Sequence, residues 1–423
     1  MRASILAGAF ALASVHGAPV NSTEMMGTDL TNGTVVSVPF NGTNTGTSSS
    51  ITGNNAKDGT NYTLAAPFTP AGGDQQTNPS YHTYSNFDFQ SLNLALNQEL
   101  IELDLFHNGL AKFSVEDFEA AGLTAADRAI IEFMANQEVG HALAVTNLIG
   151  PERAAKQCVY QYPFTTVPEF ILFCQLLTRF GESGVYGFLP HLDSRPSAQI
   201  LLQSITTVRP HVTTILEFPS DTWSQLAGGS PADDLPSASR SLPHASLYVP
   251  TSERFETGVP QSYAWTLLSP YIKSCPSNNP HIEWQNFPAL HVTNQPYALG
   301  GVPAVSTNRT LSAPGRVINF SWEEPGKIVG YDDLYKTSTV AGAPKFAAFI
   351  SQLNVTYAPL FNIVNNTGSV YQPGFDDVVY PTDPQVNGTM FISLVDAEVN
   401  LTPYNISLIL NHTVAGPALY QSG

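Results

Sequence analysis

The sequence has little charge, and positive charge is the scarcer kind. Charged residues occupy 12% of the 423 positions, and 17 Lys and Arg stand against 34 Asp and Glu, which leaves a net charge of -17. Nucleic acid and anionic membrane surfaces both require a basic footprint, so neither is expected as a partner. The hydrophobic content of 43% excludes a wholly disordered chain. Beyond the first residues, no apolar run reaches the roughly 20 residues of a membrane-spanning helix.

Cysteine is also scarce. The three cysteines allow at most one internal disulfide. Cys174 lies in an apolar helical run and is expected to pack as a small buried hydrophobe, so elimination leaves Cys158 and Cys275 as the expected bridge. The sequence lacks a Gly-x-Ser-x-Gly elbow, a His-Glu-x-x-His helix, a phosphate-binding glycine loop and a dinucleotide fingerprint. Hydrolase and nucleotide-dependent activities therefore lose their usual support.

The chain begins with the pattern of a secretory signal peptide. A charged Met1-Arg2 precedes the apolar stretch from Ala3 to Val15 and a small-residue exit, which predicts removal of residues 1–17. Acceptors for N-linked sugar, Asn-x-Ser/Thr, support passage through the secretory pathway. They are Asn21, Asn32, Asn41, Asn61, Asn308, Asn319, Asn354, Asn365, Asn387, Asn400, Asn405 and Asn411. The protein is expected to be a secreted glycoprotein, extracellular or in the cell wall.

Composition divides the remaining chain into an arm, a helical part and a β-rich part. Residues 18–78 are dominated by Ser, Thr, Asn and Gly, which predicts a disordered, glycosylated arm. Apolar residues recur at three- and four-residue spacing over the first part of 79–280, which predicts four helices there, and 218–303 is irregular. Residues 281–423 are expected to form an antiparallel β-sandwich-like domain. Its alternating runs are 316–322, 390–394 and 405–410. The fold class is therefore α+β multidomain.

Two of the expected helices place acidic side chains on their apolar faces. At about 100° per residue, Glu138 and His141 share an apolar stripe with Met134. On the preceding helix Glu99 lies in the middle of the stripe, and Glu102 lies at its edge. Such groups are costly in a core unless they bind metal, pair with a buried cation or share protons. A Glu on one helix and Glu-x-x-His on the next are half of the two-metal site of ferritin-like bundles.

Longer strings around these positions resemble one family. The strings are 97–102, 136–142, 181–187, 255–265, 284–290, 344–349 and 415–421. They are similar to the ferritin-like domain proteins of the secreted fungal stress-response and late-sexual-development family, over residue 80 to the end, and plant desiccation-related proteins carry a similar domain. The resemblance implies a ferritin-like four-helix bundle. It assigns metal-ligand roles to Glu99 or Glu102, Glu138, His141 and Glu182.

The fourth expected helix departs from the family pattern. Where the wider ferritin-like set places a Glu followed by His or Gln, this chain has Arg209, and Pro210 should remove a helix hydrogen bond and kink the segment. A guanidinium cannot bind metal, but it can form a bidentate pair with Glu99 or Glu138. Two alternatives follow. Either Glu99, Glu138 and His141 hold a single iron or manganese ion, or no metal binds and Arg209 supplies the charge.

Three functions remain open from the sequence, while the oligomeric state is not indicated. The first is a non-enzymatic protein of stress response or sexual development with a degenerate di-metal site. The second is an iron- or manganese-binding oxidase or peroxide-handling protein. The third is binding of cell-wall polysaccharide through aromatic residues of the β-rich part. These aromatic residues are Trp322, Tyr331, Tyr335, Tyr357, Tyr371 and Tyr380.

Overall fold

The structure is a computed structural model. The residues that it describes are 81–216, 255–295, 314–376 and 388–422, with the short pairs 52–53, 62–63 and 383–384. The signal peptide expected at 1–17 and nearly all of the arm expected at 18–78 lie outside them. In the unit Met1–Pro79, strands β1 (Thr52–Gly53) and β2 (Tyr62–Thr63) pair antiparallel. All other described elements belong to the compact unit Ser80–Gly423.

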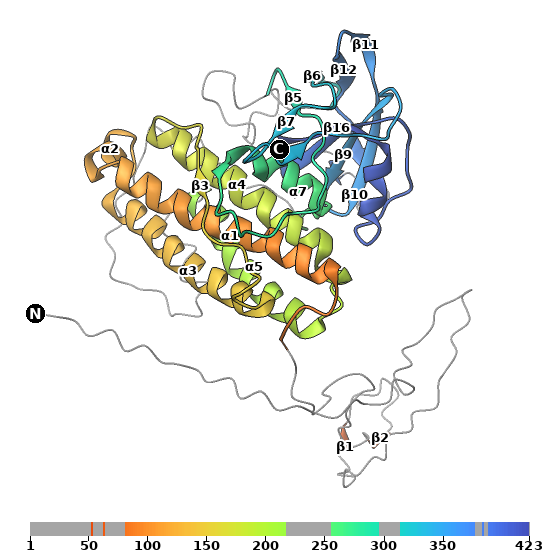
Figure 1. The fold of residues 1–423 in the computed structure, drawn as a ribbon. Helices are drawn as coiled ribbons and strands as arrows, with labels where there is room; N and C mark the ends of the chain where they lie inside the picture. The colour runs from red at the N-terminus through yellow and green to blue at the C-terminus, as the bar shows by residue number, and fades with distance from the viewer. Residues whose placement is uncertain are drawn as a thin grey trace, which may run out of the picture. The chain divides into compact units, whose positions relative to one another are not determined.

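Long helices form the first half of this unit (Figure 1). Their starts follow from local capping, because Ser114, Thr124 and Thr166 each exchange hydrogen bonds with the acidic residue three positions later. The helices are α1 (Asn86–Lys112), α2 (Val115–Ala120), α3 (Ala125–Ile149), α4 (Val167–Phe188) and α5 (Arg195–Leu216). Helix α1 lies against α3 and α4, and α5 also lies against α3 and α4. The four long helices therefore surround a shared interior.

The starts of α1 and α5 are fastened together by a buried carboxylate. Asp88 accepts hydrogen bonds from the backbone N–H groups of Tyr84, Asp193 and Ser194, at 2.9, 2.8 and 3.0 Å. From there α5 runs through Pro210 to Leu216, so the proline does not end the helix. The side chain of Arg209 lies outside the described residues.

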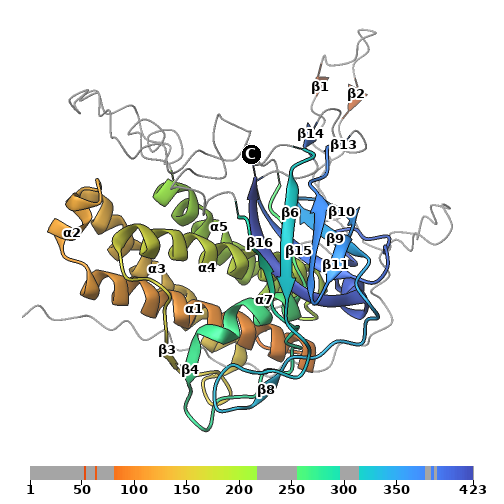
Figure 2. The ribbon, with the colours of Figure 1, turned by 90° about the horizontal axis from the view of Figure 1, so that it is seen from above.

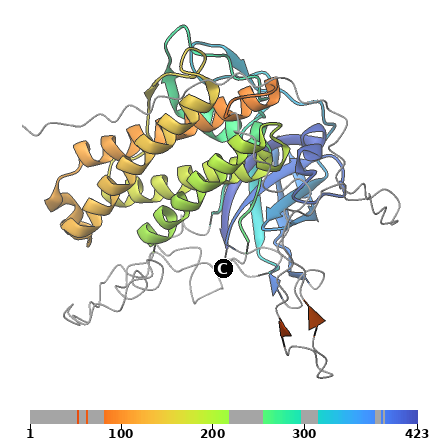
Figure 3. The same cartoon turned by 90° about the horizontal axis from the view of Figure 1, so that it is seen from below.

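Antiparallel strands form the second half of the unit, as the alternating runs predicted (Figures 2 and 3). One four-stranded sheet has the order β10-β9-β15-β16, and the other has the order β11-β12-β6-β5. Their strands are β5 (Leu290–Val292), β6 (Val317–Trp322), β9 (Phe346–Ser351), β10 (Asn354–Pro359), β11 (Phe361–Val364), β12 (Thr367–Tyr371), β15 (Gly388–Val395) and β16 (Thr413–Ser422). Shorter pairs are β3 (Val159–Tyr160) with β4 (Ile272–Ser274), β7 (Ile328–Val329) with β8 (Tyr335–Lys336), and β13 (Phe375–Asp376) with β14 (Asp383–Pro384).

Alternation along β6 decides which face of its sheet is buried. Ile318 and Phe320 are buried and belong to one hydrophobic cluster with Phe349 and Ile392 of the other sheet, whereas Val317 and Asn319 are exposed. The two large sheets therefore share one apolar core, and the second sheet keeps an outer face in contact with solvent.

Two segments differ from the sequence predictions. The run 405–410 was expected to be a strand but lies in a 3₁₀-helix, η6 (Ile406–His412). Ile406 and Ile409, three residues apart, are both buried, which is the spacing of one side of a 3₁₀-helix. The region expected to be irregular contains helix α7 (Gln261–Leu268). It is buried on several sides and therefore shows no amphipathic pattern in the sequence.

Helix α7 joins the helices to the strands, because it packs against both α4 and β16. The segment before it lies directly on α4, where the backbone N–H of Val259 donates to the carbonyl of Ser183 at 2.9 Å. On its other side the Tyr263 hydroxyl lies 2.6 Å from the hydroxyl of Thr413. Gly187 permits this close approach on α4, since a Cβ there would lie 1.8 Å from the Val259 carbonyl oxygen.

The cysteines divide into one disulfide and one buried thiol. Cys158 and Cys275 are bonded, with Cα atoms 4.3 Å apart and a separation of 117 residues along the chain. The bond lies beside the β3–β4 pair and joins the α3–α4 connection to the segment after α7. Cys174 is a free, buried thiol on α4. None of the described helices combines the length and apolar composition that crossing a membrane requires.

Substituting alanine at Gly187 tests the contact between α4 and the segment before α7. Gly187→Ala forces the Val259 backbone away and is expected to lower the free energy of unfolding by about 1–3 kcal/mol. Gly140→Ala is the matched control, since Gly140 is on α3 with nothing near its Cβ position. It should raise the free energy of unfolding by up to about 1 kcal/mol. Urea unfolding measures both, and equal effects of the two substitutions would contradict the close approach.

Candidate metal centre

Three side chains expected to face inward meet in the interior between α1 and α3. Glu99 comes from α1, and Glu138 and His141 come from α3 at the i, i+3 spacing that points two side chains the same way. Glu138 is fully buried, Glu99 is 6% exposed, and the His141 side chain is 12% exposed. The helix periodicity of each sequence segment thus placed its acidic residue on the buried face.

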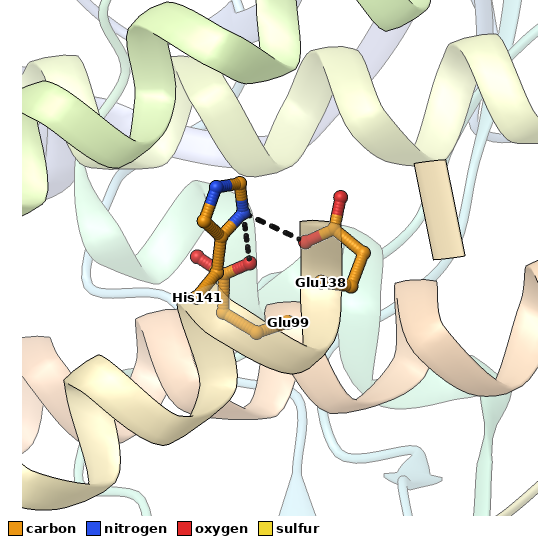
Figure 4. A group of neighbouring side chains, drawn as sticks. All are labelled: Glu99, Glu138 and His141. Carbon is orange, nitrogen blue, oxygen red and sulfur yellow. Dashed lines mark hydrogen bonds and ion pairs between the residues drawn. The ribbon is translucent and has the colours of Figure 1, made fainter. Parts of the chain in front are cut away.

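One ring nitrogen of His141 lies between the two carboxylates (Figure 4). Nδ1 is 3.0 Å from Oε2 of Glu138 and 3.4 Å from Oε2 of Glu99. One ligand atom from each of the three residues lies within 4.8 Å of the other two. Among the residues that the structure describes, these are the ones brought together as a possible metal-binding group.

The other ring nitrogen of His141 is held by Thr207 on α5. Nε2 lies 2.9 Å from the Thr207 hydroxyl oxygen, and that hydroxyl donates its single hydrogen to the backbone carbonyl of Ser204 at 2.8 Å. The oxygen must therefore accept from His141, which places a proton on Nε2. Nδ1 then faces two carboxyl groups, so a proton, on Nδ1 or on one of the carboxyl groups, or a metal cation is required between them.

Without a metal, protons on Glu99 and His141 reduce the negative charge of the buried group. Burial raises the pKa of Glu99 to about 8, with a further contribution from the charge of Glu138 and a partial offset from the His141 hydrogen bond. Burial alone would lower the pKa of His141, but its hydrogen bonds to Glu138 and Glu99 outweigh that effect and raise it to about 10. At neutral pH, protons on both His141 and Glu99 thus reduce the negative charge of the group.

The same atoms fit a metal ion. Nδ1 of His141 lies 3.0 Å from the Glu138 oxygen and 3.4 Å from the Glu99 oxygen. Donor atoms at these separations can each lie about 2.1 Å from one shared ion. Two carboxylates balance the charge of a divalent cation, and a neutral imidazole with its remote N–H hydrogen-bonded is the usual form of a histidine ligand. A set of one nitrogen and two oxygen donors suits iron, manganese or zinc. The donor chemistry of Glu99, Glu138 and His141 therefore supports a single site.

Glu102 and Glu182, which the resemblance also assigned as ligands, are buried but lie outside this group. Glu102 accepts a hydrogen bond from the side chain of Gln98, which also donates to the backbone carbonyl of Leu177 on α4. Burial, followed by the charges of Glu138 and Glu99, raises the pKa of Glu102 well above its ordinary value. Burial therefore favours the protonated form of Glu102.

Arg179 is a buried cation that the sequence analysis did not single out. It lies one helical turn before Glu182 on α4, with Nη1 3.8 Å from a Glu182 oxygen, and it pairs closely with Glu256. An arginine and a glutamate three residues apart within an otherwise apolar helix were the available signal. Arg209, expected to neutralise Glu99 or Glu138, has its side chain outside the described residues, whereas Arg179 provides a buried cation at Glu182.

The aromatic residues considered for polysaccharide binding do not share one surface. Tyr331 and Tyr335 are buried, and Tyr357 donates its hydroxyl to the backbone carbonyl of Val399. Tyr380 lies outside the described residues. Tyr371 is 59% exposed. Trp322 is partly buried and packs against the core shared by the two large sheets. These residues therefore do not form a continuous platform in the described part of the chain.

Comparison with known proteins gives a family match for the helical residues and a relative whose similarity extends into the β-rich residues. Residues 87–211 match the family described as the Ferritin-like domain. Protein rds1 of Schizosaccharomyces pombe (strain 972 / ATCC 24843) is 46% identical over an alignment of 383 residues, which covers 85% of this chain and 87% of that protein. The likeness to this fungal relative therefore includes β-rich sequence beyond the ferritin-like match.

In the metal-free protein, protonation of Glu99 and His141 stabilises the folded state. We therefore expect the protein to lose stability as pH rises. The folded chain keeps the Glu99 proton up to about pH 8, whereas the unfolded chain releases it near 4.5. The contribution of His141 to stability is complete below about pH 6.5 and is lost as the pH rises toward 10. In both cases the folded state binds more protons, so the free energy of unfolding falls as pH increases.

Denaturant unfolding of chelator-treated protein between pH 6 and 10 measures this dependence. The Glu99→Gln, His141→Gln double variant should show a flatter dependence than the parent, because both titrations are removed. Parallel curves for parent and variant would show that these groups do not hold the protons.

Proposed function

Because the chain belongs to the same family as Protein rds1 of S. pombe and carries a ferritin-like domain, we propose that it binds a single iron or manganese ion in a degenerate di-metal site. The four long helices would be a ferritin-type four-helix bundle, and the two large sheets would be a sandwich attached to it. The observation that carries the proposal is the meeting of one imidazole nitrogen and two carboxylate oxygens within 4.8 Å.

The chain's own residues have distinct roles in this site. Glu99 and Glu138 supply negative charge, and His141 supplies a nitrogen whose orientation Thr207 controls. Burial of both carboxylates excludes water, which strengthens their interaction with a cation. A bound iron or manganese ion would supply a Lewis acid that can change oxidation state. Oxidase or peroxide chemistry is the alternative role that such an ion would allow.

Arg179 supports one ion rather than two. A second ion of a ferritin-type site would need further carboxylates, and Glu102 and Glu182 are the buried candidates. Glu182 already has a guanidinium 3.8 Å away, and burial raises the pKa of Glu102, which favours its neutral form. Cation binding at Glu182 would place a second positive charge beside Arg179.

The physiological part of the proposal is a secreted glycoprotein of stress response or sexual development, extracellular or in the cell wall. It is supported by the signal-peptide pattern, the twelve sugar acceptors and the family resemblance. The strong negative charge argues against nucleic acid and anionic membrane as partners. Cell-wall polysaccharide, suggested by the aromatic content of the β-rich part, is a further candidate partner.

A second candidate function is a structural role without metal. The raised pKa of His141, about 10, favours it, because an imidazolium can bridge Glu99 and Glu138 by itself. The ferritin-like helices would then be a scaffold for the strands. Metal content separates the two candidates.

Elemental analysis of protein purified without chelators tests the metal site. About one iron or manganese ion per chain is expected, and the Glu138→Ala, His141→Ala double variant should retain none, since both donors of α3 are lost. Glu132→Gln, an exposed carboxylate on the same helix, is the matched control and should retain the ion. Background metal in the folded parent, confirmed by circular dichroism, would favour the structural role.

Thr207→Val tests the orientation of the imidazole. The substitution keeps the size of the side chain and removes the hydrogen-bond acceptor for His141 Nε2. We expect manganese affinity to fall about tenfold, as for other partners that hold a ligand histidine. Thr206→Val is the control, because Thr206 is exposed on the same turn of α5. Equal affinities measured by calorimetry for the two variants would rule out the orienting role.

A further inference from the structure

An aromatic pair lies on the outer face of the β11-β12-β6-β5 sheet, and one of its two rings is exposed. Tyr371 at the end of β12 stacks on Phe361 of β11, with ring centroids 4.8 Å apart and an interplanar angle of 30°. Tyr371 is 59% exposed, and its cross-strand neighbour Val317 is 39% exposed. A contiguous apolar patch on a solvent-exposed face is typical of a surface that another group covers.

A sugar acceptor lies diagonally across from this pair. Strand register pairs Tyr371 with Val317 and Ser369 with Asn319. Asn319 is therefore the diagonal neighbour of Tyr371, at a typical Cα separation of about 7–8 Å, which long side chains can bridge. Asn319 is exposed, and with Phe320 and Ser321 it forms one of the Asn-x-Ser acceptors.

The amide of Asn319 is oriented for attachment. Its Oδ1 accepts a hydrogen bond from the Ser369 hydroxyl at 2.8 Å. Its Nδ2, the atom that carries an N-linked sugar, has no hydrogen-bond partner among the described residues. The side chain is therefore held through its oxygen, while its nitrogen remains available.

We propose that Asn319 carries an N-glycan whose first N-acetylglucosamine lies across β12 and packs on the Tyr371 ring. Attachment forms a bond from Nδ2 to the sugar C1 and breaks the bond from C1 to the pyrophosphate of a lipid-linked oligosaccharide donor. The amide loses one proton. The C–H face of the sugar then meets the electron-rich face of the tyrosine, which is a favourable electrostatic contact. The group that covers the aromatic pair is thus a sugar attached covalently to the same chain.

This inference rests on the proposed secretory route, and occupancy of the acceptors tests the two separately. Glycopeptide mass spectrometry of full-length protein secreted from a yeast host should find sugar on Asn319 and on Asn411, an exposed acceptor on η6. Sugar on Asn411 but none on Asn319 would overturn the inference and leave secretion standing. Sugar on no acceptor would overturn both.

A double-mutant cycle tests the contact between the sugar and the ring. Tyr371→Ala should lower the melting temperature of the glycosylated parent by at least about 2 °C more than it does in a Ser321→Ala background. Ser321→Ala removes the acceptor sequence and leaves the bond between Asn319 and Ser369 in place. Asn411→Gln is the control background, in which the full effect of Tyr371→Ala should persist.

Two results would overturn the packing of the glycan on Tyr371. One is an equal effect of Tyr371→Ala with and without the Asn319 sugar. The other is binding of an N-acetylglucosamine oligomer to the glycosylated parent that is lost in Tyr371→Ala, because it would show that the aromatic pair is open to free polysaccharide.

Discussion

Buried carboxylates that require an opposite charge are the constraint on which the helical part depends. Glu99, Glu102, Glu138 and Glu182 are each at most 6% exposed, and an unpaired charge in such a place destabilises a fold strongly. The helices meet this requirement in three ways. His141 lies between Glu99 and Glu138, burial raises the pKa of Glu102 and so favours its neutral form, and Glu182 has a nearby guanidinium. A divalent cation would replace the proton at Nδ1 of His141 and satisfy the same requirement.

The strands take part in this arrangement through the segment before α7. Glu256, the second partner of Arg179, lies in that segment, which packs on α4 at Gly187 and leads into α7. Helix α7 in turn packs on β16, and Tyr263 meets Thr413 there. The position of a countercharge in the helices therefore depends on contacts that the β-rich part makes. A substitution at this junction can affect the site without touching its ligands.

Periodicity was sufficient to place some of these residues but not others. Glu99, Glu138 and His141 lie on helices with one apolar face, so their angular position alone puts them inside. Helix α4 is buried around most of its circumference, and its periodicity could not show which way Glu182 points. The same limitation hid α7. The run at 405–410 has apolar residues that fit both a strand and a 3₁₀-helix, and burial of Ile406 together with Ile409 decided between them.

The sequence by itself determined the local features: where the helices begin, which strand faces are apolar, and that Glu138 and His141 point the same way. These depend on residues a few positions apart, which helix and strand geometry relates directly. Only the tertiary structure decided that Thr207, 66 residues from His141, orients its ring, and that Glu256, 77 residues from Arg179, pairs with it. Such contacts depend on how helices and strands pack, because no local periodicity relates residues that far apart in the chain.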